Sequence, residues 1–154
     1  MISSDLRAWL SPGLAGTVAT VDASGQPQIA RVWAVRVDER HDVIEVYVQR
    51  SSSLAFIAGI ASGGRAALNL IEVCSYRSRM FKGACEVSPA EPDAVFLEEN
   101  LTALNRAFGG VGLAAGSAQS MLSHSDAPRS MVALRLTVES VFDQSPKSGA
   151  GGRL

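Results

Sequence analysis

Short β-rich runs separated by turn signals are the feature that most constrains what this chain can fold into. Residues 16–21 and 28–37 are rich in β-forming and apolar residues, and they flank residues 22–27, where Asp-Ala-Ser-Gly-Gln-Pro is typical of a turn. A charged turn at residues 38–42 leads into a third run at residues 43–48. These runs predict a hairpin followed by a third antiparallel strand.

Three further strands and several helices are expected along the rest of the chain. The strands are predicted at Arg65 to Val73, Tyr76 to Val87 and Met131 to Phe142. Helices are predicted from Ser4, as a capping residue, to Leu10, from about Leu54 to Ile60, from Pro92 at the first helical position to about Phe108, and around Ala114 to Leu122. Hairpin spacing with inserted helices predicts a mainly β (α+β) fold, a six-stranded antiparallel barrel of Greek-key type with peripheral helices. We expect one domain over residues 1–154, with a barrel core at 14–142 and a Gly/Ser-rich tail at 143–154.

Strict alternation in the second and last strands predicts which residues share a face. The second strand places Ile29, Arg31, Trp33 and Val35 on one face and Ala30, Val32, Ala34 and Arg36 on the other. The last strand sets Val132, Leu134, Leu136 and Val138 against Ala133, Arg135, Thr137 and Glu139.

Composition excludes several classes of function. The formal charge is −1 and the chain has no basic stripe, which argues against nucleic acid as a partner. No stretch approaches the roughly 18 apolar residues of a membrane helix, and the first residues do not resemble a secretory signal. A cytoplasmic protein is therefore expected, with Cys74 and Cys85 reduced and filling the core. His41 and His124 are isolated in polar loops and are expected to be solvated, so no metal site is predicted.

A possible anion site lies between the second and third strands. Arg31 offers a planar guanidinium that matches phosphate oxygens, and Ser51, Ser52 and Ser53 follow the third strand where a helix begins. The alternative is that the serines only cap the helix and Arg31 only faces solvent. Trp33 and Tyr47 on neighbouring strands either flank a planar ring or fill the core.

Residues 16–87 resemble the pyridoxamine 5'-phosphate oxidase-related FMN-binding split barrels. In that family a strand reads Arg, four mostly apolar residues, then Lys, and here Arg31 to Arg36 repeats the pattern with a final Arg. The family's phosphate-binding Ser-Arg-Lys segment is similar to Arg50 to Leu54, which keeps the serine and loses the basic pair. A third block, Arg65 to Gly83, is similar in order and spacing, with Ser78 where the family has a flavin-contacting Gln.

The resemblance implies FMN as cofactor, a homodimer with flavin sites between the subunits, and oxidoreductase chemistry on a small molecule. The residues expected at the cofactor are Arg31, Val32, Trp33, Arg36, Tyr47, Val48, Arg50, Ser51, Ser52, Ser53, Arg77 and Ser78. No residue stands out as an acid or base, which fits a reaction carried mostly by the cofactor. The oxidase itself is not expected, because its C-terminal Arg-x-His element is missing.

Three alternatives remain open at the level of sequence. The chain is a non-enzymatic flavin-binding or sensing module, a barrel that has lost its cofactor, or a binder of a related cofactor such as a deazaflavin or haem. The tail at 143–154 either folds over a cofactor edge, because its glycines let backbone approach closely, or is a disordered end.

Overall fold

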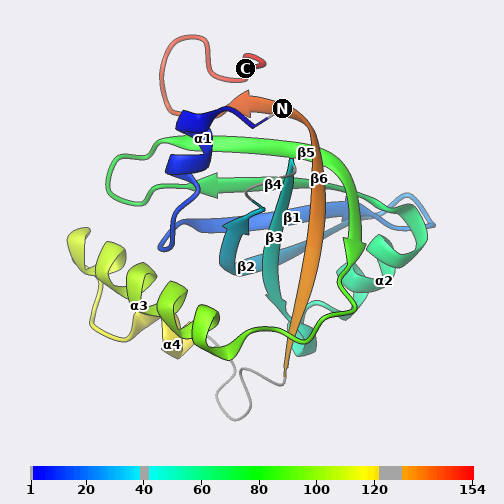
Figure 1. The fold of residues 1–154 in the computed structure, drawn as a ribbon, viewed down its shortest axis with the longest axis horizontal. Helices are drawn as coiled ribbons and strands as arrows, with labels where there is room; N and C mark the ends of the chain where they lie inside the picture. The colour runs from blue at the N-terminus through cyan, green and yellow to red at the C-terminus, as the bar shows by residue number, and fades with distance from the viewer. Residues whose placement is uncertain (1, 39–41, 122–129) are drawn as a thin grey trace.

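Six antiparallel strands close into a barrel in the computed structural model, which describes residues 2–38, 42–121 and 130–154 (Figure 1). The strands are Ala15–Val21 (β1), Pro27–Val37 (β2), Val43–Gln49 (β3), Arg65–Ile71 (β4), Ser78–Val87 (β5) and Met131–Asp143 (β6). Around the barrel their order is β1-β2-β3-β6-β5-β4. The neighbouring series β4-β1-β2-β3 is the spatial order of a Greek key, so the predicted fold class is confirmed.

The barrel interior is filled by alternating side chains from the strands. Val132, Leu134, Leu136 and Val138 of β6 all point inward, which confirms the predicted alternation of that strand. They pack against buried residues such as Phe81 of β5. Small barrels of this kind have interiors filled by side chains, so a ligand must bind outside the barrel or at its ends.

The strict alternation predicted for β2 is wrong at Trp33. The pairing register between β2 and β3 shifts between Val32 and Ala34, as at a β-bulge. Val32 and Val35 therefore both pack inside the barrel, and Trp33 and Ala34 both pack outside it. The extra residue also returns Arg36 to the face of Arg31, where strict alternation would have separated them.

The helices lie outside the barrel, and α2 begins at Leu54 as predicted, while the caps of α1 and α3 differ from those predicted. They are Ser4–Trp9 (α1), Leu54–Gly63 (α2), Ala94–Gly110 (α3) and Ser117–Met121 (α4), with a 3-10 turn at Arg50–Ser52 (η1). Ser3 rather than Ser4 caps α1, and its hydroxyl accepts from the Leu6 N–H. Asp93 caps α3 by accepting from two N–H groups, so Pro92 precedes the helix instead of opening it.

A second apolar cluster joins α3 and α4 to the outside of the barrel. We call it the outer cluster; it consists of Trp33, Ala34, Tyr47, Leu97, Leu101, Leu104, Phe108, Ala118, Met131 and Ala133. Helix α3 runs along one side of the barrel in Figure 1, with α4 next to it. The outer faces of β2, β3 and β6 are therefore covered along this stretch.

The tail folds back on the barrel, so the expectation of a disordered end is wrong. Phe142 and Arg153 form an isolated β-bridge, and the Leu154 N–H donates to the Val141 carbonyl at 2.9 Å. Gly151, at a φ of 87°, donates its N–H to the Asp143 carbonyl at 2.5 Å. Glycine adopts such a φ at no steric cost, so the tail can turn tightly at this point.

The two thiols differ, and only one of them fills the core as predicted. Cys85 is buried in the barrel, where burial raises its pKa to about 12, whereas Cys74 is exposed beside α3. At pH 8 the Cys85 thiol is therefore almost entirely protonated and unreactive. We expect a thiol-specific chromogenic reagent to label one cysteine in the native protein and two in denaturant. Equal rates for both native thiols, measured against the Cys74→Ser variant, would contradict this.

No helix in the described parts of the chain is long and apolar enough to cross a membrane. Those same residues hold no group of three or more His, Cys, Asp or Glu side chains that could bind a metal ion. The predictions for His41 and His124 lie outside the described residues.

Candidate functional site

Strand pairing brings Arg31 to the end of β3 that leads into the predicted anion site. Val32 of β2 is paired with Val48 of β3, so Arg31 lies next to the end of β3, just before η1. Arg31 and all three residues of η1, Arg50–Ser52, are exposed. Two arginines and two serines from separate parts of the sequence therefore lie near the same end of β3 with exposed side chains, and we call these four residues the Arg31 surface.

Ser53 differs from its two neighbours. It is buried at the junction of η1 and α2, where its side chain makes no capping hydrogen bond and its carbonyl accepts from the Ile57 N–H at 2.9 Å. The Ser52 hydroxyl remains at the surface and lies 3.4 Å from the Gln49 side-chain oxygen. The serine run is therefore not a simple side-chain cap, and Ser51 and Ser52 are the members accessible to a ligand.

Arg31 already contacts two neighbours. Its guanidinium lies over the Trp33 ring, 5.6 Å from the ring centroid, and its Nη1 is 3.9 Å from the Met121 Sδ of α4. A thioether is a weak acceptor, so neither contact neutralises the charge. Within the described parts of the chain, Arg31 therefore has no anionic partner and is available to bind one.

Arg36 lies at the other end of β2 and has an anionic partner. Its Nη2 is 2.5 Å from the Glu45 Oε1, and its guanidinium lies 4.9 Å from the centroid of the Phe96 ring. Arg36 lies five positions after Arg31 along the strand, roughly 16 Å at the usual rise. Arg36 and Arg50 are both predicted at the cofactor, and the geometry favours Arg50 over Arg36 as a neighbour of Arg31.

Trp33 and Tyr47 lie in the outer cluster and are almost fully covered. Trp33 is 4% exposed and Tyr47 is 1% exposed. The Tyr47 hydroxyl accepts from the Asp93 N–H at 2.9 Å, and its ring meets Phe96 edge-on. Val32 and Val48, also predicted near the cofactor, have their side chains inside the barrel, so only their backbone can reach a ligand.

Burial raises the pKa of the Tyr47 phenol above its ordinary value of 10.0. Because the pKa is raised in the folded state, the protonated phenol favours folding below about pH 10, and this contribution is lost as the pH rises through the folded-state pKa. We expect the ionisation of Tyr47, followed by absorbance near 295 nm, to come at a higher pH than in the unfolded chain. The Tyr76→Phe variant isolates the signal, since Tyr76 is the other tyrosine and is exposed. Ionisation of Tyr47 at pH 10 in a folded protein would contradict this.

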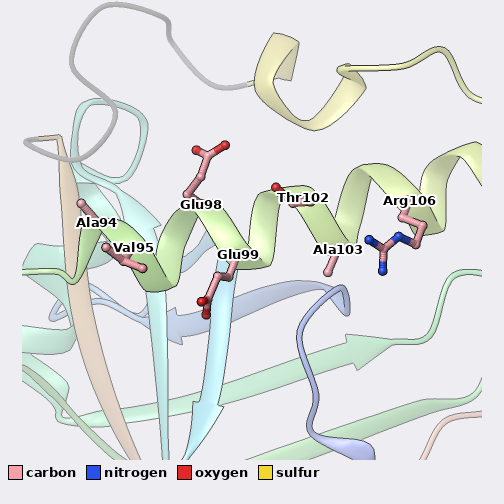
Figure 2. A pocket seen from close by; sticks show the side chains of 7 residues that line it. All are labelled: Ala94, Val95, Glu98, Glu99, Thr102, Ala103 and Arg106. Atoms are coloured by element: carbon pink, nitrogen blue, oxygen red, sulfur yellow. The ribbon is translucent and has the colours of Figure 1, made fainter.

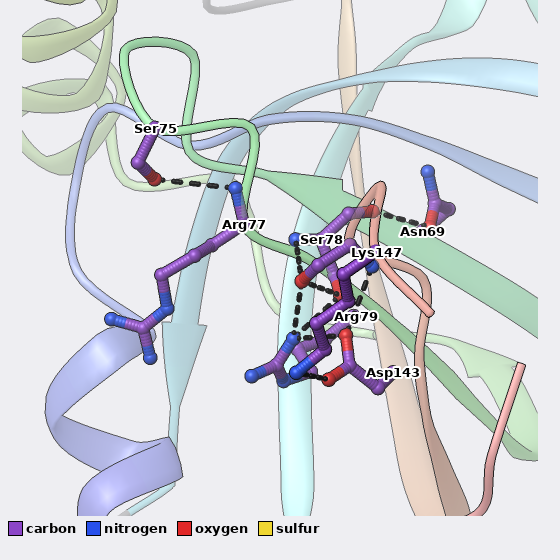
Figure 3. A network of polar contacts seen from close by, with 8 residues as sticks. Asn69, Ser75, Arg77, Ser78, Arg79, Asp143 and Lys147 are labelled. Atoms are coloured by element: carbon purple, nitrogen blue, oxygen red, sulfur yellow. Dashed lines mark hydrogen bonds and ion pairs between the residues drawn. The ribbon is translucent and has the colours of Figure 1, made fainter. Parts of the chain in front are cut away.

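Arg77 and Ser78 are far from Arg31 within one chain. β5 and β2 lie opposite each other in the closed order, with two strands between them on either side. Ser78 is buried and donates from its hydroxyl to the Asn69 side-chain oxygen at 3.1 Å. Figure 3 shows Arg77 pointing away from this group toward α1. The structure therefore does not bring these two predicted residues to the Arg31 surface.

A buried polar network that sequence reasoning missed ties the tail to β5 (Figure 3). Arg79 donates from Nη1 to the Asp143 carboxylate at 2.7 Å and to the Ser145 hydroxyl at 2.8 Å. A hydrogen bond from Lys147, assisted by Ser145, holds the pKa of Asp143 well below its usual range. The available signal was Asp143 at the end of the last strand with Ser145 and Lys147 soon after it, in a tail whose Gly-rich composition obscured them.

A shallow groove of about 520 Å³ lies along the solvent side of α3 (Figure 2). Its lining includes Val95, Glu98, Glu99 and Arg106, none of which was predicted at a site. Because Arg31 is not part of the lining, this groove is separate from the Arg31 surface.

Comparison with known proteins supports the fold. No family model and no curated protein matches the sequence. Solved structures do match: HupZ of Group A Streptococcus is 18% identical and superposes with a TM-score of 0.56, covering 99% of each chain. A protein described as an F420 reductase is 19% identical with a TM-score of 0.55, covering 88% of this chain and 94% of that one. A pyridoxamine 5'-phosphate oxidase-related, FMN-binding protein from Nostoc punctiforme is 15% identical with a TM-score of 0.51, covering 90% of this chain and 78% of that one.

These likenesses define the class of fold. The chain is a split barrel with peripheral helices, built like pyridoxamine 5'-phosphate oxidase-related proteins, as the resemblance in sequence implied. At these levels of identity the likeness concerns the fold alone.

Proposed function

We propose that this chain binds a flavin nucleotide, FMN, and holds its phosphate at the Arg31 surface. The observation that carries the proposal is the pairing of β2 with β3, which gathers Arg31 with the exposed Arg50, Ser51 and Ser52. An arginine binds phosphate through two parallel charge-assisted hydrogen bonds. Helix α2 begins just after η1, and the positive end of its dipole adds to the attraction.

The residues present fit the phosphate end of FMN better than the ring end. Two arginines supply the charge that the family's Ser-Arg-Lys segment otherwise provides, and two hydroxyls add donors. Bound flavin supplies hydride or electron transfer, while this chain holds the phosphate, orients the ring and excludes water. We propose an FMN-dependent oxidoreductase acting on a small molecule, consistent with the absence of an evident acid or base among the predicted site residues.

The proposal includes a homodimer. The exposed Arg77 can reach the flavin at the Arg31 surface only from a second copy, because β5 lies opposite β2, whereas Ser78 is buried. A shallow groove of about 540 Å³ lies on the outside of the barrel over β1, β4 and β5. Its lining includes Val21, Pro27 and Ala67. Val21 and nearby Ile29 are more than half exposed there, a surface suited to a second subunit.

A non-enzymatic flavin-binding module is the second candidate function. The observation that favours it is the burial of Trp33 and Tyr47 beneath the helices, because among the described residues no open cleft lies beside these two rings. Both candidates predict bound flavin. In the enzyme NADH or NADPH should reduce that flavin, and in the non-enzymatic module neither should. A deazaflavin is the alternative ligand, favoured by the likeness to the F420 reductase.

The test is an absorption spectrum of freshly purified protein, repeated after addition of FMN and removal of free ligand. Retained flavin bands support the proposal, and stopped-flow reduction by NADH or NADPH then separates enzyme from module. Riboflavin, which lacks the phosphate, should bind more weakly than FMN, and inorganic phosphate should compete with FMN. No retained flavin at micromolar protein would overturn the proposal, and the same experiment with F420 would then test the alternative ligand.

A further inference from the structure

Helix α3 turns one face to solvent, and nothing in the described parts of the chain covers it. The groove of about 520 Å³ runs along this face, and its lining comes from α3 alone. Val95, near the start of the helix, is 70% exposed. Near the other end lies Gly109, where a Cβ would meet nothing within 4 Å. The face, which we call the α3 face, therefore has a projecting apolar side chain at one end and open space at the other.

The α3 face also carries charges that are not paired. Glu99 and Arg106 line the groove, and Figure 2 shows both side chains extending from one edge of the helix, whereas Glu98 extends from the opposite edge. Among the residues that the structure describes, neither Glu99 nor Arg106 forms an ion pair. The positions three and four residues away from each of them along α3, where a helical ion pair would form, hold no charged residue. An acid and a base are thus exposed on the same edge, roughly 10 Å apart along the helix.

We infer that the α3 face binds the α3 face of a second copy of this chain, with the two helices antiparallel. Glu99 and Arg106 lie equally far, in opposite directions, from the point between Thr102 and Ala103. A two-fold axis at that point therefore places Glu99 of each copy opposite Arg106 of the other. One symmetric contact then forms two ion pairs, because in such an interface every contact occurs twice.

The ends of the α3 face match under the same symmetry. Val95 of each copy comes to lie opposite Gly110 of the other, next to Gly109, so the projecting side chain meets residues that have none. At the centre, Thr102 and Ala103 have short side chains. Two such helices can approach to the roughly 8–10 Å between axes that is usual for packed helices.

The α3 face is separate from the surface proposed for the flavin-binding dimer. Helix α3 covers the half of the barrel made by β2, β3 and β6, whereas the groove that includes Val21 and Ala67 lies over β1, β4 and β5. Both contacts can therefore form at once and link more than two copies. Contact through α3 requires no flavin, so it goes beyond the proposed function.

Charge reversal in the full chain, without flavin, tests the contact. Arg106→Glu places like charges opposite each other at both symmetric positions, and should weaken association at least about tenfold in sedimentation equilibrium. Adding Glu99→Arg to Arg106→Glu exchanges the charges and re-forms both ion pairs, so the double variant should associate within about threefold of the parent. Glu98→Arg is the matched control, because it makes a charge change of the same size on the opposite edge and should leave association unchanged. Circular dichroism should show every variant folded, since these side chains are exposed.

Engineered cysteines locate the contact independently of its strength. Cys74→Ser first removes the exposed native thiol. In that background, Thr102→Cys should form a disulfide between two copies on mild oxidation, because residue 102 lies next to the two-fold axis. Glu98→Cys should not, since the two copies of residue 98 would lie roughly 13 Å apart along the helices.

Assembly and flavin binding are measured separately, so each proposal fails on its own result. If Arg106→Glu associates as the parent does, or the double variant does not recover, contact through α3 is wrong. Retained flavin in the same protein would then leave the proposed function standing. Loss and recovery of association in a protein that retains no flavin would support the α3 contact and overturn the proposed function. A parent that is monomeric at every concentration would overturn the α3 contact and the proposed homodimer together.

Discussion

Replacing Arg31 by alanine should weaken FMN binding about 10- to 150-fold while leaving the protein folded. The expected loss corresponds to about 1.5–3 kcal/mol for a hydrogen bond to a charged group. Arg31 is exposed, and its contacts with Trp33 and Met121 contribute little to stability. The measurement is a titration of flavin fluorescence at fixed salt, with circular dichroism to establish that the variant folds.

Two companion variants sharpen this prediction. Arg50→Ala should weaken binding in the same direction, because η1 lies on the same surface as Arg31. Arg106→Ala removes an equal charge from α3, outside the Arg31 surface, and should leave the affinity within about twofold. If the folded Arg31→Ala protein binds FMN with unchanged affinity, the proposal that Arg31 binds the phosphate is wrong. This holds whatever affinity the Arg50→Ala variant has.

Replacing Gly83 by alanine should prevent stable folding. A Cβ at this position would lie 1.8 Å from the Thr137 carbonyl oxygen and 2.9 Å from its carbonyl carbon. These are backbone atoms of the neighbouring strand, at the point where the pairing of β5 with β6 shifts register, so they cannot turn aside as a side chain would. We expect a cost above about 3 kcal/mol, a large part of the roughly 5–15 kcal/mol that stabilises an ordinary domain.

Gly109→Ala is the matched control, because Gly109 lies in α3 and a Cβ there meets nothing within 4 Å. Alanine exceeds glycine in helix propensity, so this variant should be as stable as the parent or up to about 1 kcal/mol more stable. Urea denaturation followed by circular dichroism compares the two. A Gly83→Ala protein with the unfolding midpoint of the parent would show that β5 and β6 can separate locally at little cost.

The candidate site was predictable only where it depends on local sequence and on pairing between successive strands. Arg31 and the serine run are linked by two strands joined by a short turn, so antiparallel pairing alone brings them together. The bulge at Trp33 could not be predicted, because strict alternation fits the sequence of β2 equally well. That one residue decides that Arg36 shares a face with Arg31 and that Val35 packs inside the barrel.

The covering of Trp33 and Tyr47 also escaped prediction. The sequence around an aromatic residue on a strand is the same whether the ring faces a ligand or a helix. The helix that covers these two residues lies about 50 to 75 residues further along the chain. The attachment of the tail through Arg79 and Asp143 is of the same kind, since it joins charges 64 positions apart. Long-range contacts of this sort leave no periodic signal in either partner.

The sequence by itself determined the six strands, their antiparallel order as a barrel and the inward face of β6, because apolar alternation and turn residues act over a few neighbouring positions. It also determined the resemblance to flavin-binding split barrels. Only the tertiary structure decided that β5 lies opposite β2, that α3 and α4 cover the outer aromatic residues, and that the tail is fastened to the barrel. These features depend on closure of the sheet and on which surfaces remain to be buried after closure, and both are properties of the whole fold.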